Sequence, residues 1–226
     1  MTDLVKNLED MEMTLQNNKC LRLTALDQLQ KQEEGDPFKV LIGTILSSRT
    51  RDEQTTQAVT KLFEKYKGSQ DIADADIEDI KKTISSVGFY NIKAKRIKEV
   101  SDIINQQYHG KIPNNTKDLL ELPGVGRKTA NCVLVYGFKI PAIPVDTHVH
   151  RIFNRLGIVK TKDPEDTEEK LSKMLDKKYW IKLNSIVVRY GQNICLPVKP
   201  KCNHCKLKEN CNYYKEKNKQ VVVKTS

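Results

Sequence analysis

The sequence contains no long hydrophobic run. No apolar stretch approaches the roughly 20 residues that a membrane-spanning helix needs. The N-terminal segment Met1–Lys6 is not followed by the apolar core of a signal peptide. These two absences argue against a membrane protein or a secreted one, and they predict a soluble, intracellular protein.

Strand patterns are almost absent as well. Only Val221–Val223 is β-like, and it lies in a lysine-rich tail that we expect to be frayed. The sequence contains no internal repeat of the solenoid type. At 226 residues the chain is long enough to bury a core in one or two domains. The fold class that these features predict is all-α.

Acidic residues are outnumbered by basic ones. The 39 Lys and Arg residues exceed the 29 Asp and Glu residues, which gives a formal net charge of +10 and a pI of about 9.2. A basic balance of this size favours a polyanionic partner, either nucleic acid or an anionic membrane surface.

Helical patterns recur along the chain. Asp36-Pro37 and Asp163-Pro164 each combine an N-cap with a first-turn proline, and amphipathic segments follow them. Asp146 precedes another amphipathic segment that ends at Gly157. Further helices are predicted over residues 76–87, 92–108, 116–121 and 127–136, and around residues 59–66 and 180–190.

The segment of residues 122–146 contains the most informative motif. Pro123 ends a short helix, for which we predict Thr116 as the N-cap. Gly124 and Gly126 permit backbone angles that other residues avoid, so the chain can turn sharply between two helices. The first amides of the second helix lie at the positive end of its dipole and bind phosphate well. Such a contact positions a duplex without reading its sequence.

Lys128 lies in the first turn of that second helix. The helix dipole and the neighbouring Arg127 both disfavour another cation there, so we expect the pKa of Lys128 to be lowered. A lysine with a neutral amine is a nucleophile for Schiff-base chemistry. The other interpretation is a charged, exposed lysine that contacts a phosphate, and its position alone leaves both open.

Asp146 directly precedes the helix that contains His148. It can act simply as the N-cap of that helix, which involves no catalysis. A role as N-cap is nevertheless compatible with a role in catalysis. A capping carboxylate is held ionised and fixed, and its second oxygen can face a cleft.

Four cysteines near the C-terminus are separated by six, two and five residues: Cys195, Cys202, Cys205 and Cys211. The segment that contains them has no apolar periodicity and little to bury, so it needs a cross-link to hold its fold. Four thiolates at this spacing bind either zinc or an iron–sulfur cluster, and residue types alone leave both open. We expect Cys20 to be a buried or half-buried thiol, and Cys132 to lie in the core.

The sequence LPGVGRKTAN at residues 122–131, followed by VDTH at 145–148, resembles the helix-hairpin-helix DNA glycosylases, and most of all their endonuclease III branch. The resemblance extends from about Phe38 to Cys211. It implies Lys128 as the nucleophile, Asp146 as its partner, and a [4Fe–4S] cluster held by the four C-terminal cysteines. The expected partner is duplex DNA with damaged bases or abasic sites, bound by a monomer in the cytoplasm or nucleoid, or in the nucleus of a eukaryote.

Two further positions follow from the resemblance. The endonuclease III branch usually has glutamine where Arg49 stands, in the turn that faces the lesion; an arginine there fills the gap left by an extruded nucleotide or simply contacts a phosphate. Phe89 occupies the position of the apolar wedge, where an aromatic ring stacks into a kinked step, or else it covers the core. The residues predicted to contact DNA are Arg49, Phe89, Leu122, Gly124, Val125, Gly126, Arg127, His148, Lys199 and Lys201.

The resemblance also implies two helical lobes. Residues 30–140 would form a six-helix lobe with the hairpin, and residues 1–29 and 141–226 would form the lobe with the cluster. The predicted function is a bifunctional DNA glycosylase/AP lyase that excises oxidised pyrimidines of the thymine glycol type through a lysine Schiff base and β-elimination. The alternatives are a mismatch glycosylase of the same fold, a non-catalytic DNA-binding module and an iron–sulfur electron carrier.

Overall fold

A computed structural model describes residues 4–17 and 35–225 of the chain, which form twelve α-helices and no strand within those ranges. The all-α prediction is confirmed. No helix in this part of the chain is long and apolar enough to cross a membrane. Cys20 lies outside the described residues.

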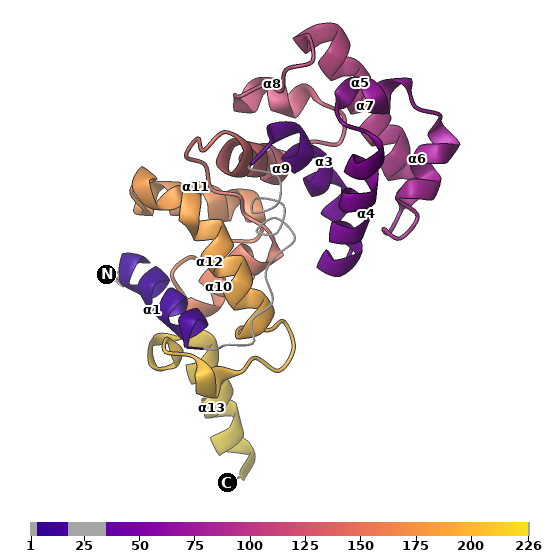
Figure 1. The fold of residues 1–226 in the computed structure, drawn as a ribbon. Coiled ribbons are helices and arrows are strands. Elements are labelled where there is room, and N and C mark those ends of the chain that lie inside the picture. The colour runs from indigo at the N-terminus through magenta and orange to yellow at the C-terminus, as the bar shows by residue number, and fades with distance from the viewer. Residues whose placement is uncertain (1–3, 18–34, 226) are drawn as a thin grey trace. The chain divides into compact units, whose positions relative to one another are not determined.

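The chain divides into two compact units. Thr24–Pro144 form one of them, which we call the central unit, and Met1–Leu23 with Val145–Ser226 form the other, the terminal unit. The helices of each unit are drawn in Figure 1.

The central unit is built around one buried helix. Its helices are α3 (Pro37–Ser47), α4 (Asp52–Lys65), α5 (Ser69–Asp74), α6 (Ile77–Thr83), α7 (Tyr90–Tyr108), α8 (Thr116–Glu121) and α9 (Arg127–Cys132). Helix α3 is apolar on nearly every side, and it packs against α4, α7 and α9. Helix α5 packs against α7; with six residues it is too short to show a periodic pattern in the sequence.

Local capping explains where several of these helices begin. The Asp36 carboxylate accepts from the amides of Phe38 and Lys39, and Pro37 is the first residue of α3, as the sequence predicts. One predicted cap is wrong: Asn115, not Thr116, is the N-cap of α8, and its side chain accepts from the Asp118 amide. Asparagine one residue earlier offers the stronger capping side chain.

The helix after the hairpin is not α-helical throughout. Helix α9 continues into the π-helix η1 (Val133–Gly137), where the sequence predicts an α-helix as far as Tyr136. Gly137 lies close to α3, since a Cβ on it would lie 2.9 Å from the Pro37 Cα. A wider turn often marks a functional position in a helix, and here it follows directly on the helix that contains Lys128.

The terminal unit combines both ends of the described chain. It contains α1 (Leu4–Gln16), α10 (Thr147–Leu156), α11 (Pro164–Met174), α12 (Trp180–Asn193), α13 (Asn212–Thr225) and the short helices η2 (Lys177–Tyr179), η3 (Cys202–His204) and η4 (Lys208–Asn210). Helix α12 packs against α1 and α10, and α10 also packs against α11 and α13. Val221–Val223 belong to α13 and not to a strand.

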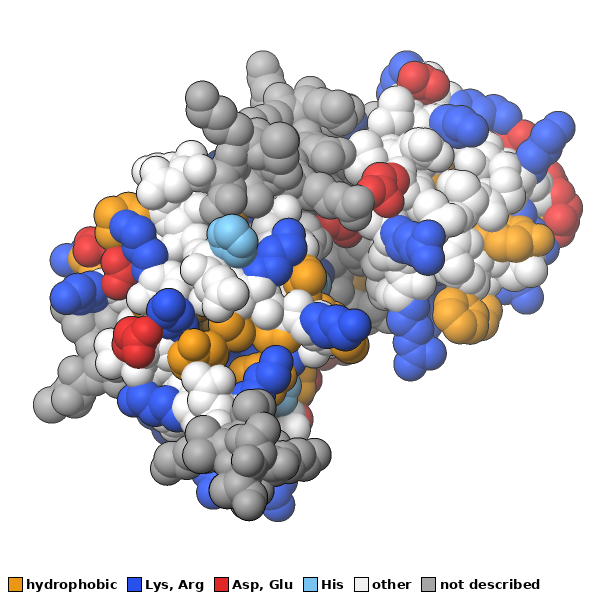
Figure 2. All heavy atoms as spheres, turned by 90° about the horizontal axis from the view of Figure 1, so that it is seen from below, with side chains coloured by type: hydrophobic (Ala, Val, Ile, Leu, Met, Phe, Trp, Pro, Cys, Tyr) orange, Lys and Arg blue, Asp and Glu red, His pale blue; other side chains and the backbone are white. Residues whose placement is uncertain are grey.

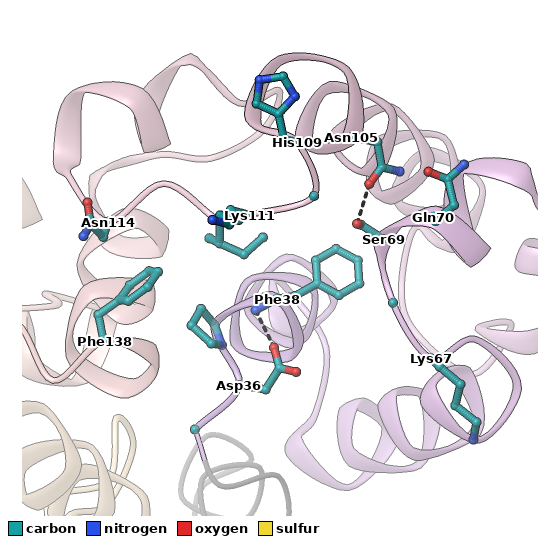
Figure 3. A pocket seen from close by; sticks show the side chains of 15 residues that line it. Asp36, Phe38, Lys67, Ser69, Gln70, Asn105, His109, Lys111, Asn114 and Phe138 are labelled. Atoms are coloured by element: carbon teal, nitrogen blue, oxygen red, sulfur yellow. Dashed lines mark hydrogen bonds between the residues drawn. The ribbon is translucent and has the colours of Figure 1, made fainter.

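Figure 3 shows an open hollow in the central unit, with a volume of about 1150 Å³. Its lining includes Asp36, Phe38 and the hydrogen-bonded pair of Ser69 and Asn105, whose side chains are 2.6 Å apart. None of the residues predicted to act on DNA lines this hollow. Arg49, Phe89 and the turn before α9 lie on other parts of the central unit, and the predicted site residues from Asp146 onward belong to the terminal unit.

Candidate functional site

The turn between α8 and α9 buries two side chains and exposes two glycines. Leu122 and Val125 are only 2% and 6% exposed, and their backbones are joined by a hydrogen bond of 3.1 Å. Gly124 has a φ of +75°, and both glycines of the turn are exposed. The two apolar side chains therefore anchor the turn, which leaves its backbone groups available to a ligand.

Lys128 lies in the first turn of α9, where it is half-buried, and Arg127 beside it is exposed. The hydrogen bonds of the helix begin with the Ala130 amide, which donates to the Gly126 carbonyl at 2.9 Å. The amides before it point out of the helix N-terminus. One turn further on, Asn131 donates to the carbonyl of Ile143 and fixes the loop that leads out of the central unit.

The Asp146 carboxylate uses both of its oxygens. Oδ1 accepts from the amides of His148 and Val149, each at 2.9 Å, which makes Asp146 the N-cap of α10 as predicted. Oδ2 lies 2.9 Å from Nδ1 of His148. The second oxygen thus holds the imidazole of the same helix. Lys128 belongs to the central unit and Asp146 to the terminal unit.

Arg49 and Phe89 come together in the central unit although they are 40 positions apart in the sequence. The guanidinium of Arg49 lies 5.9 Å from the centroid of the Phe89 ring. Both residues adopt positive φ, of 52° and 58°. Phe89 is 59% exposed, so the alternative in which it covers the core is wrong.

All four C-terminal cysteines line one cavity in the terminal unit, together with Tyr190, Arg155 and Lys208. The Tyr190 hydroxyl donates to the Cys205 Sγ at 3.0 Å. Burial raises the pKa of the Cys205 and Cys211 thiols. Within residues 4–17 and 35–225, no group of three or more His, Cys, Asp or Glu side chains is arranged to hold a single metal ion. Cys132, in contrast, is fully buried in α9, as predicted.

Two arginines of α10 hold the loop that contains Cys195. Arg155 donates to the carbonyls of Leu196 and Pro197, both at 2.7 Å, and stacks on the Tyr213 ring at 4.4 Å. Arg151 donates to the Cys195 carbonyl at 2.9 Å. Sequence reasoning did not single out these arginines, because their partners are backbone carbonyls about 40 residues away.

The remaining predicted contacts are basic side chains on the surface. Lys199 and Lys201 are exposed in the cysteine loop, and Lys199 has a φ of 51°. Figure 2 shows that Lys and Arg side chains are more widespread than Asp and Glu on the face drawn there. This distribution agrees with the net charge of +10.

Comparison with known proteins identifies the family. Residues 42–177 match the model of the HhH-GPD superfamily of base excision DNA repair proteins. Endonuclease III of Thermotoga maritima is 51% identical over 193 residues, which cover 85% of this chain and 91% of the relative. The chain belongs to the endonuclease III family. Endonuclease III of Bacillus subtilis is 35% identical, with 84% of this chain and 87% of that protein covered.

Solved structures agree with this assignment. One is a trapped covalent intermediate of endonuclease III and DNA with an estranged adenine; its TM-score is 0.82 at 30% identity, with 95% of this chain and 96% of that chain covered. A thermostable thymine-DNA glycosylase has a TM-score of 0.81 at 27% identity, with 92% and 95% covered. Membership in the endonuclease III family makes the chain an enzyme, a DNA glycosylase/AP lyase of base excision repair, which excludes the non-catalytic module and the electron carrier.

The hairpin turn yields a stability prediction. Gly124→Ser is expected to lower the free energy of unfolding by about 1–2 kcal/mol, because an L-residue is strained at positive φ, and because a Cβ there would overlap the Arg96 side chain, which would have to move. Gly126→Ser is the matched control: its φ of −96° is ordinary and a Cβ there meets nothing within 4 Å. Serine is also a good N-cap, so this variant should keep the wild-type stability in urea denaturation. Equal losses in both variants would contradict this account of the turn.

Proposed function

We propose that this enzyme excises oxidised pyrimidines of the thymine glycol type from duplex DNA, and that Lys128 then cuts the strand through a Schiff base. The observation that carries the proposal is the similarity to an endonuclease III trapped as a covalent intermediate with DNA. A covalent intermediate needs a nucleophile from the enzyme. Lys128, in the first turn of α9, is the amine that follows the hairpin.

Chemistry on the base requires that the nucleotide leave the helix. A base inside a duplex is unreachable, so the enzyme extrudes the nucleotide at a cost of a few kcal/mol, which is lower for a damaged base. The amides at the start of α9 and the exposed Arg127 hold the phosphates of the strand. Arg49 and Phe89, which lie together, fill the gap and separate the neighbouring bases.

Lys128 then attacks the sugar. The nitrogen of its neutral amine bonds to C1′, the glycosidic bond breaks, and the base leaves with the bonding electron pair and takes up a proton. Opening of the sugar ring gives a protonated imine between C1′ and the lysine. The imine makes the proton at C2′ acidic; its removal expels the 3′ phosphate, which cuts the strand on the 3′ side. Water hydrolyses the remaining imine and restores the amine.

Asp146 supplies a fixed negative charge to this reaction. Because two amides and an imidazole hold its carboxylate, it does not reorganise during the reaction. We infer that it accepts the proton that the Lys128 ammonium must lose and gives it to the ring oxygen as the sugar opens. Once ionised again, it stabilises the positive charge that the sugar carries as a protonated imine. A mismatch glycosylase without a lysine nucleophile would not need an amine at this position.

The cysteine cavity fits a [4Fe–4S] cluster. Four thiol side chains surround one cavity, and cysteine thiolates are the ligands that such clusters prefer. The guanidinium of Arg155, 3.5 Å from the Cys195 Sγ, and that of Arg151, on the Cys195 carbonyl, would offset the negative charge of four thiolates. When bound, the cluster supplies a structural cross-link and takes no part in the chemistry on the base. Residues Lys199 and Lys201 of the same loop would then contact phosphates.

Lys128→Gln is expected to abolish both base release and strand cleavage, because the amide side chain cannot form the imine. Binding to a duplex with an abasic site should stay within a few fold of wild type, since the hairpin amides remain. Arg127→Gln is the matched control, for which we expect weaker binding with cleavage retained at saturating enzyme. Gel-based single-turnover assays measure both steps. Cleavage by Lys128→Gln at the wild-type rate would contradict the assignment.

Asp146→Asn separates the chemical role of the carboxylate from its role as a cap. Asparagine caps a helix about as well as aspartate, so the thermal stability should hardly change. Loss of the charge and of the proton acceptor should slow base release by about a hundredfold or more. If base release kept its wild-type rate, the carboxylate would act only as an N-cap.

The cluster proposal predicts the metal content of the purified protein. Iron and acid-labile sulfide should each be present at about four per chain, with an absorbance band at about 400 nm. Cys202→Ser should lose the band and most of the iron, whereas Cys132→Ser should keep both, because Cys132 is buried in the other unit. About one zinc per chain and no absorbance band would overturn the proposal in favour of a zinc site.

A further inference from the structure

Lys93 is a buried cation that the mechanism above does not use. It lies in the first turn of α7 and is only 3% exposed. Its Nζ donates to the carbonyls of Leu46 and Ser48, each at 2.7 Å, and to the hydroxyl of Thr50 at 2.8 Å. An ammonium group has three donors, so all of them are used on one short segment.

That segment is the turn in which Arg49 lies. Ser48 and Thr50 flank Arg49, and Leu46 belongs to the last turn of α3. Carbonyls at the C-terminus of a helix lack partners inside it and favour a cation. The Lys93 ammonium therefore donates to carbonyls that have no partner within α3. Lys93 itself belongs to α7, more than 40 residues further along the chain.

The Thr50 hydroxyl extends the same network to the loop of Phe89. It accepts from the Gly88 amide at 3.1 Å as well as from Lys93, and it donates to the Ser48 carbonyl at 3.3 Å. The two loops approach so closely that a Cβ on Gly88 would lie 3.0 Å from the Arg49 carbonyl oxygen. The Arg49 turn and the Phe89 loop are thus joined through Lys93 and Thr50.

The joined residues are in strained conformations. Arg49 and Phe89 both have positive φ, which costs on the order of 1–3 kcal/mol for a residue other than glycine and persists only where the surroundings enforce it. Neither side chain is held by burial, because both are exposed. Backbone hydrogen bonds hold each turn locally, such as those from the Ile92 and Lys93 amides to the Phe89 carbonyl. The side chains of Lys93 and Thr50 add the hydrogen bonds that join the two turns to each other.

Burial of this lysine is unfavourable in itself. Desolvation lowers the pKa of Lys93 to about 8, which reflects the cost of keeping a charged group out of water. An apolar side chain would fill the same space without that cost. The hydrogen bonds that Lys93 makes to the Arg49 turn therefore account for a cation at this buried position.

We propose that Lys93, with Thr50, is a positioning residue that holds Arg49 and Phe89 as one rigid element for separating the damaged nucleotide from its partner base. This inference rests on the DNA contacts proposed above for Arg49 and Phe89. Lys93 does not touch the DNA, and it acts only on the step in which the duplex is opened. The proposal thus assigns a role in the reaction to a buried residue beneath the proposed DNA-binding surface.

The test compares two substrates in single-turnover cleavage by the full-length enzyme. The first is a duplex with thymine glycol opposite adenine. The second has an abasic site opposite another abasic site, so it has neither a base to extrude nor an orphaned base to separate. Lys93→Met and Thr50→Val remove the network, Thr50→Ser keeps the hydroxyl, and Lys61→Met removes one exposed positive charge from α4. Arg49→Ala reports on the DNA contact itself, and thermal melting reports on the fold.

We expect Lys93→Met and Thr50→Val to slow cleavage of the first substrate by about tenfold to a hundredfold and to leave cleavage of the second within about twofold of wild type. Arg49→Ala should slow cleavage of the first substrate to a similar extent. Thr50→Ser and Lys61→Met should match wild type on both. If Lys93→Met does not fold, Thr50→Val decides the question alone. Equal losses on both substrates would reduce Lys93 to a merely structural role and overturn the inference.

Two other outcomes separate this inference from the proposed function. If Arg49→Ala slows the first substrate selectively while Thr50→Val behaves as wild type, the network does not position Arg49, and the inference fails while the proposed contacts stand. If Arg49→Ala and Phe89→Ala both cleave the first substrate at the wild-type rate, the proposed DNA contacts are wrong and the inference fails with them.

Discussion

The positive φ of Gly124 sets the direction in which the chain enters α9. Leu122 and Val125 are buried on either side of it and anchor the turn at two points. The unusual backbone conformation between them is supplied by the glycine. Since α9 begins at Arg127, this turn determines where the first amides of the helix and the Lys128 side chain point. Phosphate binding and the proposed nucleophile therefore depend on one backbone conformation that only glycine adopts without strain.

Fixed polar contacts, more than apolar packing, hold the groups that are proposed to act on DNA. Two amides and the His148 imidazole orient the Asp146 carboxylate, and the Lys93 ammonium orients the turn of Arg49. Such contacts are costly to bury and directional. They establish the geometry before DNA arrives, so less binding energy is lost in ordering the site. The central and terminal units each contribute a preorganised part of the proposed machinery.

The sequence predicts those features that depend on neighbouring residues. The caps at Asp36, Asp146 and Asp163 follow from short-range hydrogen bonds, and the structure confirms all three. Features that depend on distant partners could not be predicted from the sequence. Lys93 resembles any other lysine of a basic helix, and Arg155 meets its carbonyl partners only after the chain has folded. The exposure of Phe89 and the π-helical turn after α9 are also set by tertiary packing, which periodicity does not report.

The central claim is that the amine of Lys128 forms the covalent bond to the sugar. Its most direct test is to trap the enzyme with borohydride on a duplex that contains thymine glycol, digest the adduct, and locate the modified residue by mass spectrometry. The account predicts one reduced sugar remnant on the peptide that contains Lys128. An adduct on another lysine or on the N-terminal amine, or no adduct on this duplex or on one with an abasic site, would contradict it.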